Sequence, residues 1–168
     1  MERNSKLWAI ALSAMMLSTP SVLAQSITGR ISVWSGSEFL MTGPNITVRL
    51  YGIEACALDQ VAHFNGVAWR CGVVSAGWLT QLTLGYEVKC LEEQAGGYAT
   101  VFARCFLPSG EDIAKLALEQ GMAWAARHNG RPIENTYGLI EDEARNKKTG
   151  IWSSNFEYGG VFDRTEKR

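Results

Sequence analysis

Apolar and polar side chains alternate along the start of the chain in the pattern of a half-buried β-strand, over residues 27–33. Two closely spaced turns follow, at residues 34–37 and 42–45. They separate the first strand from a short strand over 38–41 and a third over 46–53. Short strands joined by close turns predict an antiparallel meander.

The apolar period changes after residue 66. Spacings of three and four residues predict a helix over 66–82, because such spacings place side chains on one helix face. The members of this predicted apolar face are Val67, Cys71, Val74, Trp78 and Leu82.

The second half of the chain predicts a hairpin and two more helices. A strand over 86–90 turns at Gly96-Gly97 into a returning strand over 98–107. Helices are predicted over about 111–120, ended by Gly121, and over about 134–148. This order of elements predicts a mainly β fold with α-helices, a five-stranded OB-type barrel capped by about three helices.

The N-terminus has the features of a secretory signal peptide. Arg3 and Lys6 precede an apolar run over residues 7–17, and Val22 and Ala24 are small residues before a cleavage site. We therefore predict a signal peptide over residues 1–24 and a secreted or periplasmic protein, the alternative being an uncleaved N-terminal anchor. We expect one domain over residues 25–153 and a loose tail over residues 154–168.

Charge argues against a strong nucleic-acid binder. The 168-residue chain has 16 basic and 17 acidic residues. Two of the basic residues and one of the acidic residues lie in residues 1–24. The remaining 14 basic and 16 acidic residues give a net charge of about −2, whereas nucleic-acid binders usually carry a basic patch. We expect weak or absent nucleic-acid binding, no membrane association and a monomer.

Four cysteines in an exported protein indicate two disulfides, with three pairings open. Cys90 and Cys105 are nearly equidistant from Gly96-Gly97, as cross-strand partners in a hairpin are. We predict a Cys90–Cys105 disulfide on this basis, and a Cys56–Cys71 disulfide that ties the loop after the third strand to the first helix. No zinc spacing is present, and we expect no metal.

Residues 48–57, V-R-L-Y-G-I-E-A-C-A, resemble the R-L-x-x-[IV]-D-x-P-E signature of the thermonuclease (staphylococcal nuclease-like) family. The resemblance covers roughly residues 27–152 and implies the OB-type barrel. Its further anchors are Asp112-Ile113-Ala114, Leu118-x-x-Gly121-Met122-Ala123, Tyr137, Glu143-Ala144-Arg145 and Gly150-Ile151-Trp152.

The resemblance also implies where a catalytic site would lie. In this family the signature carries a phosphate-binding arginine, a calcium-ligating aspartate and a catalytic glutamate. Here the arginine is retained as Arg49 and the aspartate is replaced by Glu54. Cys56 takes the place of the proline, and Ala57 takes the place of the glutamate.

Other family positions are also changed. A V-x-D-G-D-T turn matches residues 33–38, where Ser35 and Ser37 replace both aspartates. A Y-G-R turn matches residues 98–100, where Thr100 replaces a second arginine. We expect Glu38 to be a solvated strand residue whose side chain points to the face opposite to that of Ser37. We expect Arg104 to be a surface arginine.

These losses predict a catalytically inactive family member that binds an unknown ligand in the barrel groove or acts as a structural module. No cofactor is expected. The alternative is an active calcium-dependent secreted endonuclease that hydrolyses DNA or RNA. The Arg70-Cys71-Gly72 motif also resembles exported thermonuclease-like proteins labelled as succinoglycan (exopolysaccharide) biosynthesis proteins, which implies a link to exopolysaccharide production.

Overall fold

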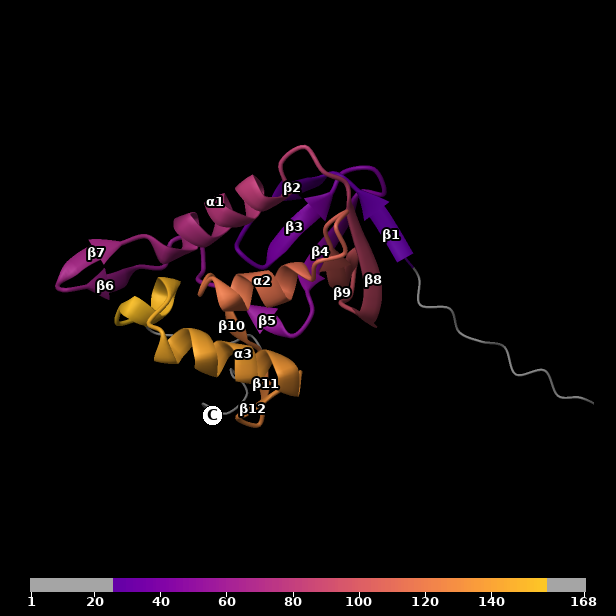
Figure 1. Ribbon diagram of the computed structural model, residues 1–168. Coiled ribbons are helices and arrows are strands. Elements are labelled where there is room, and N and C mark those ends of the chain that lie inside the picture. The colour runs from indigo at the N-terminus through magenta and orange to yellow at the C-terminus, as the bar shows by residue number, and fades with distance from the viewer. Residues whose placement is uncertain (1–25, 157–168) are drawn as a thin grey trace, which may run out of the picture.

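A computed structural model describes residues 26–156, which are coloured in Figure 1. The predicted signal peptide and residues 157–168 lie outside the described residues. The strands of the main sheet are β1 (Ser26–Gly29), β2 (Ile31–Val33), β3 (Glu38–Met41), β4 (Ile46–Leu50), β8 (Val88–Ala95) and β9 (Thr100–Phe106). The helices are α1 (Cys71–Thr83), α2 (Ile113–Glu119), α3 (Asn135–Asn146) and the 3-10 segment η1 (Gly150–Ser153). Three two-stranded pairs complete the fold, namely β5 (Ile53–Glu54) with β10 (Trp124–Ala125), β6 (Ala62–Phe64) with β7 (Val67–Trp69), and β11 (Arg127–His128) with β12 (Arg131–Pro132).

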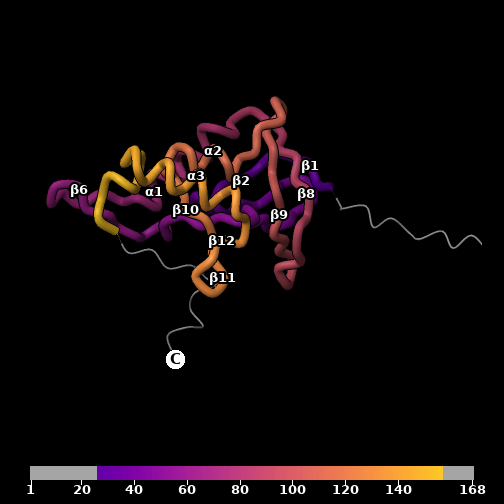
Figure 2. Tube along the Cα trace, turned by 60° about the horizontal axis from the view of Figure 1, so that its bottom comes forward, coloured from indigo at the N-terminus to yellow at the C-terminus, as the bar shows by residue number. Residues whose placement is uncertain are grey.

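The main sheet curls into an open barrel. Its strand order is β1-β8-β9-β4-β3-β2, so β1 and β2 lie at opposite edges although only Arg30 separates them in the chain. The two edges can be so close in sequence only because the sheet bends round on itself (Figure 2). The predicted barrel is confirmed, with six strands because the first predicted strand is bent into two.

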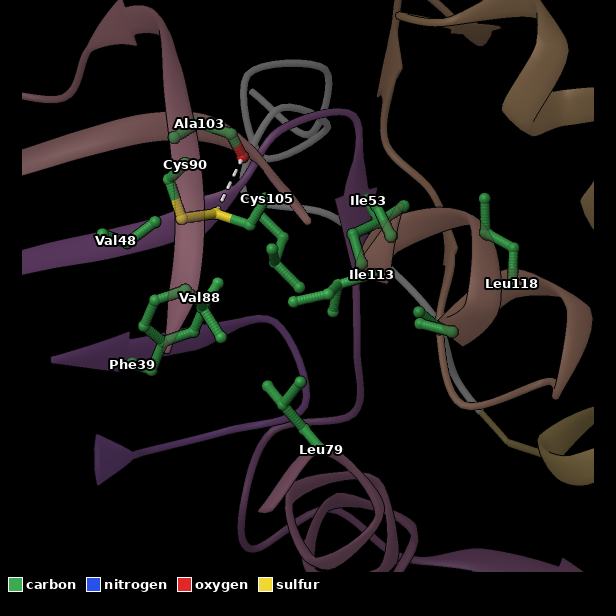
Figure 3. Close-up of a cluster of buried hydrophobic side chains, with 14 of the residues drawn as sticks. Phe39, Val48, Ile53, Leu79, Val88, Cys90, Ala103, Cys105, Ile113 and Leu118 are labelled. Carbon is green, nitrogen blue, oxygen red and sulfur yellow. Dashed lines mark hydrogen bonds between the residues drawn. A yellow bond between two sulfur atoms is a disulfide. The ribbon is translucent and has the colours of Figure 1, made fainter. Parts of the chain in front are cut away.

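The Cys90–Cys105 disulfide lies inside this barrel. Cys90 and Cys105 are directly opposed in the β8–β9 register, and neither is exposed to solvent. Figure 3 shows the bond among buried side chains that include Val48 and Val88. The pairing predicted from the hairpin is confirmed, as is the Cys56–Cys71 disulfide.

The segment before α1 differs from the prediction, since residues 67–69, at the start of the predicted helix, form strand β7 and pair with β6 in a hairpin (Figure 1). Asn65 and Gly66 sit at its tip with φ angles of 51° and 80°. Two consecutive residues with positive φ make the tight turn that joins antiparallel strands, and Asn-Gly favours it. The helical period therefore begins only at Cys71, after the hairpin.

The predicted apolar face of α1 was also wrong in part. Val67 is 69% exposed and Val74 is 44% exposed, whereas Trp78 and Leu82 do pack against the core. The buried face of α1 is formed by Cys71, Gly72, Ser75, Leu79 and Thr83. Small residues allow the helix to lie close to its neighbours, and the Ser75 hydroxyl donates to the Met122 carbonyl at 2.8 Å. Hydrophobic spacing alone does not detect a face of this kind.

The start of the predicted loose tail is held in place. Asn155 exchanges two backbone hydrogen bonds with His63 of β6, at 2.8 and 2.9 Å. The Trp69 indole N–H donates to the Ser154 hydroxyl at 2.9 Å. The Phe156 ring packs 5.3 Å from the Trp152 ring, between centroids. Residues 154–156 therefore belong to the folded domain.

A buried carboxylate fastens α3 to the rest of the fold. Glu141 has no solvent exposure and accepts the Ala125 backbone N–H at 2.8 Å. It also accepts hydrogen bonds from the guanidinium groups of Arg127 and Arg145, at 3.0 and 2.7 Å. The charge is thus neutralised and hydrogen-bonded on several sides, as a buried charge must be.

Candidate functional site

Arg49 lies on the outer face of the sheet, near the end of β4. Its neighbours Val48 and Leu50 are buried, and the β4 side chains alternate between core and surface. The chain then turns at Gly52, where φ is 77° and an added Cβ would lie 3.0 Å from the Tyr137 ring. Only glycine fits this turn without strain and steric overlap.

The turn at Gly52 brings Arg49 and Glu54 to the lining of one hollow. Gln94, Phe102 and other residues complete its lining, and its volume is about 30 Å³. Sites that enclose small ligands measure roughly 300–1,000 Å³. The hollow has room for a water molecule but cannot enclose a nucleotide or a sugar, so a ligand would have to lie across the surface.

The Arg49 guanidinium has partners on both neighbouring strands. Its Nε lies 4.0 Å from Glu38 Oε2 on β3, and its side chain is 26% exposed. Its Cζ lies 5.4 Å from the centroid of the Phe102 ring on β9, a cation–π contact. Glu38 was expected to point away from the face of Ser37, and the β3–β4 register places it directly opposite Arg49, on the outer face of the sheet. The sequence could have predicted this pairing, because residues 38 and 49 are equidistant from the centre of the turn at residues 42–45.

The serine positions belong to a tight turn between β2 and β3. Ser37 is 8% exposed and its carbonyl accepts the Leu50 N–H at 2.9 Å. The Ser37 N–H donates to the Ser35 hydroxyl oxygen at 3.3 Å. A Cβ at Gly36 would lie 2.6 Å from the Cβ of Ser75 on α1, so the turn is packed closely against that helix. Ser35 and Ser37 therefore supply no negative charge at this turn.

Ala57 lies in an exposed loop that a disulfide holds against α1. Cys56 is bonded to Cys71, the first residue of the helix. A Cβ at Gly72 would lie 1.9 Å from the Ala57 carbonyl oxygen, so loop and helix backbones are in direct contact. The Ala57 N–H donates to the Gln60 side chain at 3.0 Å. No acid or base is present on the Ala57 side chain.

Thr100 lies at the start of β9, and its hydroxyl donates to the Tyr98 carbonyl at 3.3 Å. It is aligned with Thr47 of β4 and supplies no positive charge at this position.

Arg104 was expected to be a surface arginine; it lies on the outer face of the sheet, 25% exposed, and is the centre of a network of polar contacts that the sequence did not predict. Its guanidinium donates to Glu93, to Glu134 and to the Tyr137 hydroxyl, at 3.1, 3.2 and 3.2 Å, and lies 3.8 Å from Asp112. The network joins β8 and β9 to the residues that precede α2 and α3. Sequence spacing could not reveal it, because its members come from four separate elements.

Tyr137 is the buried centre of this network. Its hydroxyl donates to Asp112 at 2.6 Å. Burial raises the pKa of the Tyr137 phenol above the ordinary value of 10.0, and the hydrogen bond to Asp112 and its charge raise it further, against the opposing effect of Arg104.

We therefore predict that Tyr137 makes stability fall at alkaline pH. Below pH 10 the phenol is protonated in both folded and unfolded chains, so its contribution is fully present. As pH rises further, the unfolded phenol ionises first, and the free energy of unfolding falls by up to about 1.4 kcal/mol per pH unit. Urea titrations at a series of alkaline pH values should show a shallower fall for Tyr137→Phe. Tyr98→Phe is the control, because Tyr98 is fully exposed and its removal should leave the wild-type slope unchanged.

The donor set at these positions does not fit calcium, the metal that the family resemblance implies. Calcium takes roughly six to eight oxygen ligands, several of them carboxylates. Here Glu54 is the one carboxylate at the matched positions, Ser35 already accepts a backbone N–H, and Ala57 has no side-chain oxygen. Among residues 26–156, no three His, Cys, Asp or Glu side chains are grouped as a metal site requires.

Comparisons with known proteins agree with this fold. The chain is 32% identical over 124 residues to micrococcal nuclease of Shigella flexneri, which covers 69% of the chain and 66% of that protein. It is 30% identical over 141 residues to the probable endonuclease lcl3 of Botryotinia fuckeliana, covering 74% of the chain but 52% of that protein. An uncharacterized endonuclease of Escherichia coli is 26% identical over 148 residues, with 86% and 88% covered.

The chain thus spans about half to two thirds of the length of the first two relatives. The profile of the family described as staphylococcal nuclease homologue matches residues 47–154, from the second residue of β4 to the residue after η1. This region includes Arg49, Glu54, both disulfides and all three α-helices. The chain belongs to the staphylococcal nuclease family.

Proposed function

We propose that this protein is a catalytically inactive member of the family, kept as a binding or structural module. The observation that carries the proposal is the chemistry of the changed positions. Ser37 and Ala57 replace a metal-binding carboxylate and the catalytic glutamate, and Thr100 replaces an arginine. Together these changes remove one of the metal ligands, the base and one of the phosphate-binding cations.

The size of the expected loss supports this proposal. Removing one fixed electrostatic donor lowers catalytic rates by about 100- to 1,000-fold in other enzymes. Losing a general base costs about 100- to 10,000-fold. These effects do not add simply, but with all three groups absent no partial mechanism is left. Arg49, the arginine that is retained, supplies neither a base nor a metal ligand.

We propose an oxidising compartment, secreted or periplasmic, as the place where the protein acts. Both disulfides and the signal-peptide pattern of residues 1–24 support this location. Among residues 26–156, no helix is long and apolar enough to cross a bilayer. Nucleic-acid binding is proposed to be weak, and a role in exopolysaccharide production would then depend on binding rather than hydrolysis.

The deciding experiment is a digestion assay. Purified residues 25–168 are incubated with plasmid and with single-stranded DNA in millimolar calcium at alkaline pH, which favours hydrolysis. We expect wild type and Arg49→Ala to be equally inactive. Arg30→Ala, which removes an exposed arginine at the bend between β1 and β2, serves as a matched control for contaminating nuclease. Cleavage that is present in wild type and Arg30→Ala but lost in Arg49→Ala would instead support an active endonuclease, as the relatives are named.

A further inference from the structure

We infer that the Glu38 carboxylate is a counter-ion for Arg49 and prevents this arginine from binding the phosphate groups of external polyanions. The inference rests on the proposed function, since it concerns what a site that binds without cleaving can accept. Glu38 would then be the residue that weakens the binding of nucleic acid to this face.

The strand register fixes this pair. Glu38 of β3 and Arg49 of β4 are directly opposed, and the flanking Phe39–Val48 pair is buried in the core. The side chains of Glu38 and Arg49 therefore emerge on the same outer face, where their charged atoms lie 4.0 Å apart. Both side chains are about one third exposed or less, at 33% and 26%, which shields the pair from solvent in part.

The other side of the guanidinium is also covered. Phe102 of β9 is aligned with Arg49 in the parallel β4–β9 register, and its ring lies 5.4 Å from the guanidinium carbon. Arg49 thus lies between a carboxylate on one neighbouring strand and an aromatic ring on the other. An external phosphate would have to take the place of the Glu38 carboxylate or bind close to its negative charge.

Arg104 cannot take over as an anion site. Phe102 and Arg104 are two residues apart on β9, so they share the outer face with Arg49. Arg104 is already engaged by Glu93, Asp112 and Glu134, at 3.1, 3.8 and 3.2 Å. Arg104 is therefore already neutralised by carboxylates of the protein itself.

The test compares binding of fluorescent single-stranded oligothymidylate, measured by anisotropy with chelator present so that no calcium-dependent cleavage can occur. We expect Glu38→Gln to bind about tenfold more tightly than wild type at low salt. The reason is that the substitution removes the repulsion between the carboxylate and a phosphate a few ångströms away, which corresponds to about a tenfold change in affinity. The gain should shrink as salt is raised. The double variant Glu38→Gln with Arg49→Gln should return to the wild-type affinity.

Glu87→Gln is the matched control, since it removes one exposed carboxylate just before β8. It should change affinity far less than Glu38→Gln. The inference is overturned if the two single variants bind alike, or if the gain persists without Arg49. Thermal melts of each variant establish that all are folded. Cleavage by the wild-type protein in calcium would refute the proposed inactivity but would leave this comparison, made in chelator, to be judged separately.

Discussion

Replacing Glu141 by alanine is expected to destabilise the fold by about 3 kcal/mol. The substitution removes a fully buried carboxylate that neutralises Arg127 and Arg145 and accepts the Ala125 N–H. Both guanidiniums would lose their buried counter-charge, and the Ala125 N–H would lose its acceptor. Because the two arginine side chains are 23% and 33% exposed, water can reach them in part, which places the effect at the lower end of the range for buried pairs.

Urea denaturation at neutral pH measures this effect directly. Glu143→Ala is the matched control on the same helix, because Glu143 is exposed and pairs only with Lys147 among the contacts described for it. We expect no measurable change for that variant. Glu141→Gln should lie between wild type and Glu141→Ala, since it keeps an acceptor for Ala125 but loses the charge. Equal stability of the Glu141 and Glu143 alanine variants would show that the buried carboxylate is not what fastens α3.

The second large effect is expected at Gly72 on α1. An alanine Cβ there would lie 1.9 Å from the Ala57 carbonyl oxygen and 2.5 Å from the Ala57 carbonyl carbon. Both are backbone atoms of a loop that the Cys56–Cys71 disulfide holds in place, so they cannot move aside easily. We expect Gly72→Ala to lower the free energy of unfolding by about 3 kcal/mol, the upper part of the range for overpacked sites.

Gly77→Ala on the same helix should raise the free energy of unfolding instead of lowering it. Nothing lies within 4 Å of a Cβ built at Gly77, and alanine is the better helix former. This variant should be stabilised by about 0.5–1 kcal/mol. Thermal melts of the two variants, with both disulfides intact, provide the comparison. If both variants were stabilised, the close approach of the loop to α1 would be disproved.

The parts of the fold predicted from sequence depend on local signals. Gly96-Gly97 sets the centre of the β8–β9 hairpin, and that centre gives the Cys90–Cys105 pairing. Close turns between short strands indicate a meander, and a meander with capping helices indicates the barrel. These features could be predicted because each depends on residues that are near one another in the chain.

The parts that were missed depend on tertiary contacts or on a signal given too little weight. Asn65-Gly66 is a strong hairpin signal, yet the apolar spacing through Val67 favoured a helix instead. The buried face of α1 contains glycine and serine, which hydrophobic periodicity does not count. Of the site, Arg49, Glu54 and the changed positions could be located in sequence, whereas the contact of Arg49 with Glu38 required the strand register. The Arg104 network could not be predicted at all, because it joins residues brought together only by folding.

The order of the cysteines has a consequence for how the protein matures. Each disulfide joins cysteines that are consecutive in the sequence, Cys56 with Cys71 and Cys90 with Cys105, and each spans 15 residues. A chain that enters an oxidising compartment N-terminus first presents Cys71 as the first available partner of Cys56. Once that pair has formed, Cys105 is the first partner that Cys90 meets. Pairing in order of appearance therefore gives the native connectivity, and we expect oxidative refolding of the reduced chain to need little reshuffling of wrong bonds.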